Sequence, residues 1–175
     1  NGIATFVPRL IEAGEGGHVV NTASMAGLMA SAGNSIYCTS KFAVVGLSEG
    51  LRKELAPKGI GVTVLCPAAI KTNINRAQRN RPDALGDTSE ALDADGMALL
   101  DKSFDGGTDP AEFGAMVLDA VQNDAPYVIP HQEFAAAYRD KVEGIMDIWS
   151  GEAPPAMRVE GNELRKQAFQ RMWER

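Results

Sequence analysis

Two short apolar segments, residues 18–23 (HVVNTA) and 61–66 (GVTVLC), enclose a long amphipathic helical pattern over residues 35–58. Both segments are rich in β-branched residues, and a proline follows the second, which is typical of strands. A third short apolar segment lies at 127–129. Apolar rather than alternating strands, separated by helices, favour a parallel sheet that is covered on both faces. The pattern therefore predicts an α/β fold.

Helical and irregular segments fill the rest of the chain. Residues 1–13 have apolar residues at helical spacing and end at a glycine cluster, and the segment 109–123 begins with an Asp-Pro helix start. Residues 71–107 mix charged residues with scattered alanines and leucines, which indicates a lid insertion with helical pieces. The tail, about 133–175, is predicted to be amphipathic helix with a break near 151–155.

The length of 175 residues and the hydrophobic content of 45% predict a single domain, residues 1–175, with a sizeable core. The chain starts at Asn1, without Met, inside an apparently helical pattern. We therefore interpret it as a piece of a longer protein, or as a processed or incomplete one.

The charge balance is acidic, with 23 Asp and Glu against 17 Lys and Arg and a formal net charge of -6. This balance disfavours nucleic acid and anionic membranes as general partners. No apolar run approaches the roughly 18–20 residues that span a bilayer. Cys38 and Cys66 are too few for a disulfide framework, so we expect two reduced thiols, a reducing compartment and a cytoplasmic protein.

Tyr37 and Lys41 carry the first chemical signal. They stand four residues apart on the predicted helix, so their side chains share one face, with Cβ atoms roughly 5–6 Å apart. A free phenol ionises only near pH 10, and a neighbouring ammonium group favours the phenolate. The alternative is a pair of solvated side chains, which is the commoner case for any single pair of this kind.

Two loops are predicted to lie beside the start of this helix. Ser24 follows the first strand, and the segment Pro67–Thr72 follows the second. Ligands of parallel α/β sheets bind outside the carboxyl ends of the strands, so both loops lie on the edge where a ligand is expected. A hydroxyl, a phenol and an ammonium group on that edge suit proton transfer at an alcohol or ketone, and a cofactor must then supply the hydride.

Ser24, thirteen residues before Tyr37, together with the run Tyr37-Cys-Thr-Ser-Lys41, resembles the short-chain dehydrogenase/reductase family, most clearly over residues 16–67. The resemblance implies the C-terminal half, about three strands, of a Rossmann-like parallel sheet with helices on both faces. It also implies an NAD(P)-dependent oxidoreductase that interconverts a small-molecule alcohol and ketone. In this family's scheme Tyr37 is the general acid/base, Lys41 makes the phenol more acidic and binds the nicotinamide ribose, and Ser24 orients the substrate carbonyl.

The resemblance further implies that the segment Pro67–Thr72 lies along the nicotinamide, with Ile70 and Thr72 near its carboxamide. The family usually has glycine where Ala68 stands, and a methyl group there is a small intrusion. The cofactor-binding residues that follow from the resemblance are Tyr37, Lys41, Pro67, Ala68, Ile70 and Thr72.

Three family features are expected upstream of Asn1: the glycine-rich phosphate-binding turn, a catalytic asparagine and the residue that chooses between NAD and NADP. The sequence therefore does not indicate which of the two cofactors is used. The family commonly forms dimers and tetramers through helices that correspond to 1–13 and 35–57. We expect a homodimer or homotetramer of the full-length parent.

Three alternative functions compete with this interpretation. A serine hydrolase would need Gly-x-Ser-x-Gly or Ser-x-x-Lys, and neither template fits the residues around Ser24 and Lys41. A sugar-nucleotide epimerase or dehydratase shares the Tyr and Lys pair, but the compact lid favours the shorter dehydrogenase type. An incomplete, catalytically inactive fragment that only self-associates is the third alternative.

The remaining polar residues give weaker signals. His18 and His131 have no second ligand at metal spacing, so we expect ordinary surface or packing residues and no metal site. The arginines of the lid are expected on a solvated face, or, as a minority interpretation, one of them meets an acidic substrate. These arginines are Arg76, Arg79 and Arg81.

Overall fold

The computed structural model describes residues 1–86, 93–149, 151 and 153–173. It divides into two compact units, Asn1–Gln132 and Glu133–Arg175. The first unit contains the sheet and every residue that the sequence singles out for chemistry. The part of the predicted lid at 87–92 lies outside the described residues.

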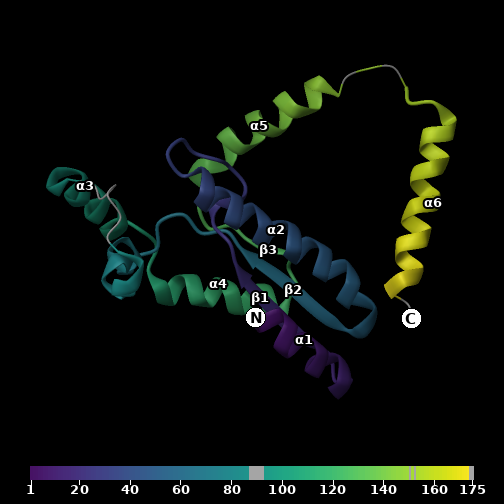
Figure 1. The fold of residues 1–175 in the computed structure, drawn as a ribbon, viewed down its shortest axis with the longest axis horizontal. Coiled ribbons are helices and arrows are strands. Elements are labelled where there is room, and N and C mark those ends of the chain that lie inside the picture. The colour runs from purple at the N-terminus through teal and green to yellow at the C-terminus, as the bar shows by residue number, and fades with distance from the viewer. Residues whose placement is uncertain (87–92, 150, 152, 174–175) are drawn as a thin grey trace. The chain divides into compact units, whose positions relative to one another are not determined.

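The sheet of the first unit has three parallel strands in the order β1-β2-β3 (Figure 1). The strands are β1 (Gly17–Thr22), β2 (Ile60–Leu65) and β3 (Tyr127–Val128). Pairing between β1 and β2 is continuous from Gly17 opposite Ile60 to Thr22 opposite Leu65. The predicted parallel, Rossmann-like α/β fold is confirmed, and each strand lies within one residue of its expected start.

Six α-helices are found among the described residues. They are α1 (Gly2–Ala13), α2 (Ser35–Leu55), α3 (Ala94–Asp105), α4 (Pro110–Gln122), α5 (Ala135–Ile148) and α6 (Ala156–Trp173). Short 3-10 turns at 25–27, 56–58, 74–80, 83–85 and 132–134 complete the regular structure. The predicted break in the tail falls between α5 and α6, which belong to the second unit.

Local chemistry explains where two of the helices begin and end. Helix α1 stops because Gly14 adopts the left-handed conformation, with φ of 67°, and its N–H bonds the carbonyl of Leu10. Helix α4 starts as predicted at Pro110, and the Asp109 carboxylate accepts hydrogen bonds from the first free backbone N–H groups, including that of Ala111 at 2.8 Å.

The core lies on both faces of the sheet. On one face, Val7 of α1 and Leu51 of α2 pack with Val62 of β2. On the other face, Ala120 of α4 packs with Leu65 of β2 and with β3. Because side chains alternate along a strand, Val62 and Leu65 point to opposite faces. The central strand is therefore buried from both sides, which explains its continuous apolar sequence.

The predicted apolar stripe of α2 is partly wrong. The helical spacing of Val44, Leu47, Leu51 and Leu55 predicts that these four residues face the core, but Leu47 is 49% exposed. The inward face instead consists of Cys38, Val45, Ser48, Leu51 and Leu55. The loop after β1 packs against this face at Val45, and α1 and β2 pack against it at Leu51 and Leu55.

Glycine is a poor helix former, so the sequence suggests a break in the lid at Gly96, but the structure has none there. Gly96 lies in the first turn of α3, where its N–H donates to the Asp93 carboxylate at 2.8 Å. The cap stabilises the helix start and offsets the poor helix propensity of glycine. Within the described residues, no helix is both long enough and apolar enough to cross a membrane.

Candidate active site

Ser24 joins the ends of two strands. It follows β1 in extended backbone and caps the 3-10 turn at 25–27, where its Oγ accepts from the N–H of Ala26 at 3.1 Å. The same hydroxyl donates to the carbonyl oxygen of Pro67 at 3.3 Å. The N–H of Met25 donates to that oxygen too, at 2.9 Å. The Ser24 loop and the loop after β2 thus lie together at the carboxyl ends of the strands.

Gly27 brings this loop against α2. A Cβ atom at residue 27 would lie 2.7 Å from the carbonyl oxygen of Lys41 and 3.0 Å from a methyl group of Val45. Real side chains essentially never approach backbone so closely, so only glycine fits without displacement. The contact places the Ser24 loop beside the turn of α2 that carries Lys41.

Lys41 connects the phenol of the predicted pair with the end of β1. Its Nζ lies 5.6 Å from the centre of the Tyr37 ring and donates to the carbonyl oxygen of Thr22 at 3.3 Å. Thr22 stands two residues before Ser24. Tyr37 itself is 46% exposed, so its ring is open to solvent and to a ligand.

A second Tyr–Lys pair shows which part of this arrangement is unusual. On α5, the Nζ of Lys141 lies 5.8 Å from the centre of the Tyr138 ring. That pair lies outside the sheet-bearing unit. Proximity of a lysine to a tyrosine therefore does not by itself mark a site, and the further observation here is the bond from Lys41 to the strand end at Thr22.

The loop after β2 is bonded on one side to the segment that precedes α4. The N–H of Thr108 donates to the carbonyl of Ala69 at 3.1 Å, and the N–H of Lys71 donates to the carbonyl of Thr108 at 2.9 Å. These two bonds form an isolated parallel bridge between Ile70 and Thr108. Thr72 lies beyond the bridge, exposed, and its Oγ1 accepts from the N–H of Ile74 at 3.4 Å.

His131, which we expected to be an ordinary surface or packing residue, is buried and bonds the same loop. Its Nδ1 lies 3.2 Å from the backbone N of Ala68, and its Nε2 lies 3.1 Å from the carbonyl oxygen of Ala69. Sequence reasoning missed this link. The available signal was its position just after β3, at the same edge of the sheet as Ser24.

The arginines of the lid bond groups within the lid. Arg76 forms an ion pair with Asp101 at 2.7 Å, and the hydrogen bond from this guanidinium lowers the pKa of the Asp101 carboxyl. Arg79 donates to the carbonyls of Asn73 and Arg76, and Arg81 to those of Leu85 and Gly86. These internal contacts favour a structural role over contact with an acidic substrate.

Both cysteines are free thiols with buried side chains. Burial raises the pKa of Cys66 to about 11, although a backbone hydrogen bond from Ser24 partly opposes the shift. The Cys66 thiol is therefore protonated near neutral pH and is a poor nucleophile.

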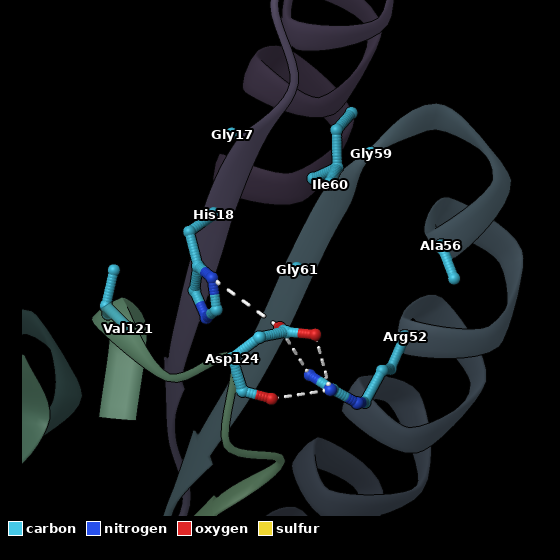
Figure 2. Close-up of a pocket in the computed structure, with 9 residues that line it drawn as sticks. All are labelled: Gly17, His18, Arg52, Ala56, Gly59, Ile60, Gly61, Val121 and Asp124. Carbon is cyan, nitrogen blue, oxygen red and sulfur yellow. Dashed lines mark hydrogen bonds and ion pairs between the residues drawn. The ribbon is translucent and has the colours of Figure 1, made fainter. Parts of the chain in front are cut away.

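A hollow at the opposite, amino-terminal end of the strands is lined by charged residues that bond one another. Figure 2 shows His18, Arg52 and Asp124 pointing toward one another across Gly61. Arg52 donates to both carboxylate oxygens of Asp124, at 2.9 and 2.8 Å, and to the Val62 carbonyl at 2.8 Å. These bonds join α2, β2 and the turn before β3, so the group is a structural clamp.

His18 completes this clamp. Its Nε2 lies 2.8 Å from Thr63 Oγ1, and that hydroxyl donates to the carbonyl of Ala125. Burial lowers the pKa of His18, Asp124 opposes the shift, and Arg52 adds to it. The described residues contain no group of three or more His, Cys, Asp or Glu side chains placed to hold a metal ion.

Comparisons with known proteins agree with this architecture. The family model described as short chain dehydrogenase matches residues 1–83. The C alpha-dehydrogenase of Sphingobium sp. (strain NBRC 103272 / SYK-6) is 35% identical over 169 residues, which cover 97% of this chain and 54% of that relative.

Two solved structures extend the comparison. A short chain dehydrogenase/reductase from Burkholderia phymatum in complex with NAD is 32% identical, with a TM-score of 0.71, and the match covers 88% of this chain and 56% of that one. The apo form of LigO from Sphingobium sp. strain SYK-6 is 34% identical, with a TM-score of 0.64. The match covers 95% of this chain and 53% of that one. The chain belongs to the short-chain dehydrogenase/reductase family, and it spans about half the length of these relatives.

Proposed function

We propose that this chain carries the proton-transfer site of an NAD(P)-dependent oxidoreductase that interconverts an alcohol and a ketone. The observation that carries the proposal is the bridge made by Lys41, whose ammonium group lies over the Tyr37 ring and bonds the strand end next to Ser24. Family membership supports the reaction class, and the NAD bound to the Burkholderia phymatum relative supports a nicotinamide cofactor.

Each side chain has a distinct role in the proposed reaction. In the oxidation direction, Tyr37 accepts the proton of the substrate hydroxyl, and in reduction it returns that proton to the carbonyl oxygen. Lys41 stabilises the phenolate electrostatically during the step. The Ser24 hydroxyl donates its one hydrogen to the carbonyl of Pro67. In the proposed reaction it rotates and donates that hydrogen to the substrate oxygen instead. When bound, the nicotinamide takes the hydride that leaves the carbinol carbon.

The loop after β2 fits a nicotinamide carboxamide. In the parallel bridge with Thr108, the bonds run through Ala69 and Lys71, so the N–H and C=O of Ile70 point away from Thr108. Neither group of Ile70 bonds another described residue. A primary carboxamide offers one acceptor and two donors, which complement such a peptide edge. We assign Pro67, Ala68, Ile70 and Thr72 to the nicotinamide, with Ile70 and Thr72 near its carboxamide. Lys41 and Tyr37 are assigned to the ribose.

Self-association is part of the proposal. Helices α1 and α2 expose large apolar side chains, including Phe6 at 60%, Ile36 at 88% and Leu47 at 49%. Burial of such residues between copies of the protein would stabilise a homodimer or homotetramer. The two buried, reduced thiols suit a cytoplasmic location. The competing proposal, an inactive chain that only self-associates, shares this surface.

Nicotinamide fluorescence distinguishes the two proposals. NADH and NADPH are titrated separately into the 175-residue chain and into the full-length gene product, and the oligomeric state of each is measured by analytical ultracentrifugation. We expect a saturable fluorescence change with the full-length product. A change with that product alone assigns activity to the parent and association to the shorter chain, whereas no change with either contradicts the oxidoreductase proposal.

A further inference from the structure

His131 makes two complementary hydrogen bonds to adjacent residues of the loop after β2. The residue is only 8% exposed. A backbone N–H can only donate and a carbonyl oxygen can only accept, so Ala68 donates to Nδ1 and Nε2 donates to Ala69. Both bonds form together only with the neutral imidazole whose hydrogen is on Nε2. The ring thus bridges the N–H of one loop residue and the carbonyl oxygen of the next.

The hydrogen bonds from His131 and those from Thr108, at the base of the lid, fix the same loop. The carbonyl oxygen of Ala69 accepts from both His131 and Thr108, so two separate segments fix one peptide group. Gly107 lies so close that a Cβ there would stand 2.6 Å from the same oxygen. The peptide groups on either side of Ile70 are therefore fixed before any ligand binds.

This fixation determines where the free peptide edge of Ile70 points. Because consecutive peptide groups alternate in direction in extended backbone, fixing Ala69 and Lys71 toward Thr108 aims the groups of Ile70 the opposite way. We propose that His131 is a positioning residue, which holds the Ala68–Ile70 backbone in the orientation that binds the nicotinamide carboxamide. The proposal rests on the proposed function, and His131 acts through the loop without touching the cofactor.

The competing explanation is that His131 only fills space beneath the loop. A filler would be replaced well by an apolar ring of similar size, whereas a positioning residue would not. His131→Phe keeps a ring and loses both bonds. His131→Asn keeps an acceptor at the position of Nδ1, which allows the bond from Ala68, and loses the bond to Ala69.

The first readout is steady-state kinetics of the full-length protein. We expect His131→Phe to raise the KM for the nicotinamide cofactor about tenfold, as loss of two hydrogen bonds predicts, and His131→Asn to give an intermediate value. The KM for the alcohol should change less than threefold. His18→Phe is the matched control, since it removes the imidazole at the other end of the sheet and should leave the cofactor KM unchanged.

The second readout needs no cofactor. Hydrogen exchange of the Ala68 amide should become at least about tenfold faster in His131→Phe, while the amide of Ala23, which bonds Leu65 at 2.8 Å, keeps its wild-type rate. Nitrogen-15 shifts should report a neutral His131 ring protonated on Nε2.

The outcomes separate this inference from the proposed function. An unchanged cofactor KM in His131→Phe, or unchanged exchange at Ala68, overturns the positioning role. A wild-type protein that turns over no nicotinamide contradicts the proposed function, and the exchange rates then still decide whether His131 fixes the loop.

Discussion

Gly27 and Lys41 meet backbone to backbone, and a Cβ atom at residue 27 would lie 2.7 Å from the Lys41 carbonyl oxygen. This approach joins the loop that carries Ser24 to the helix that carries Tyr37. The proposed arrangement of Ser24 and Tyr37 therefore depends on Gly27, because a larger residue would hold the loop away from α2.

Gly27→Ala should separate the loop from α2. The added methyl group meets backbone that cannot move alone, so we expect a loss of about 1–3 kcal/mol in the free energy of unfolding. Urea denaturation measures it. Gly46→Ala is the matched control, because a Cβ at this position in α2 meets nothing within 4 Å. It should be neutral or stabilise by up to about 1 kcal/mol, and an equal loss in both variants would contradict the close contact.

Arg52→Met should weaken the clamp at the amino-terminal end of the sheet. It leaves the Val62 carbonyl without its side-chain donor and removes the ion pair with Asp124. Because the Asp124 side chain is 60% exposed, the ion pair contributes little, and we expect a loss of about 1–2 kcal/mol in unfolding free energy. Lys166→Met, which removes an exposed pair with Glu163, should cost less than about 0.5 kcal/mol. Equal losses would argue against the clamp.

His18 should make stability depend on pH. Its pKa is lowered below 6.5 in the folded chain, so the unfolded state binds the proton more readily. The stabilisation is complete above about pH 6.5 and is lost as the pH falls through the lower, folded value. Arg52 lowers the pKa of the Asp124 carboxyl from 3.8, so this group changes the stability only in more acid solution.

Melting temperatures between about pH 5 and 7 test this dependence. The wild type should lose stability toward pH 5, and His18→Gln, which can still donate to Thr63, should lose less. If the melting temperatures of the two proteins fell equally with pH, His18 would be ruled out as the source of the pH dependence.

Much of the fold was predictable because its signals are local. The Asp109-Pro110 start of α4 and the strand ends depend on neighbouring residues, and the structure has them within one residue of their predicted positions. The exposure of Leu47 was not predictable, because the face that α2 turns inward depends on contacts with distant segments, such as Gly27 against Val45 and Val62 against Leu51.

Part of the candidate site could likewise be predicted from local sequence, and part of it depends on contacts between distant residues. The proximity of Tyr37 and Lys41 follows from helical spacing alone. The bonds from His131 span 63 and 62 residues, and no local pattern encodes them. Histidine spacing can indicate metal ligands, but it does not indicate a histidine that bonds a distant backbone. The roles of Ser24, Tyr37 and Lys41 stay predictions.

Turnover of Tyr37→Phe in the full-length protein tests the central claim most directly. Secondary alcohols and ketones are screened with NAD and NADP, and the variant is then compared with wild type on the best substrate. We predict that kcat falls at least about hundredfold, the range for loss of a general acid/base, with an unchanged melting temperature. Tyr138→Phe, from the other Tyr–Lys pair, should keep wild-type turnover. Near-normal turnover of Tyr37→Phe would contradict the account.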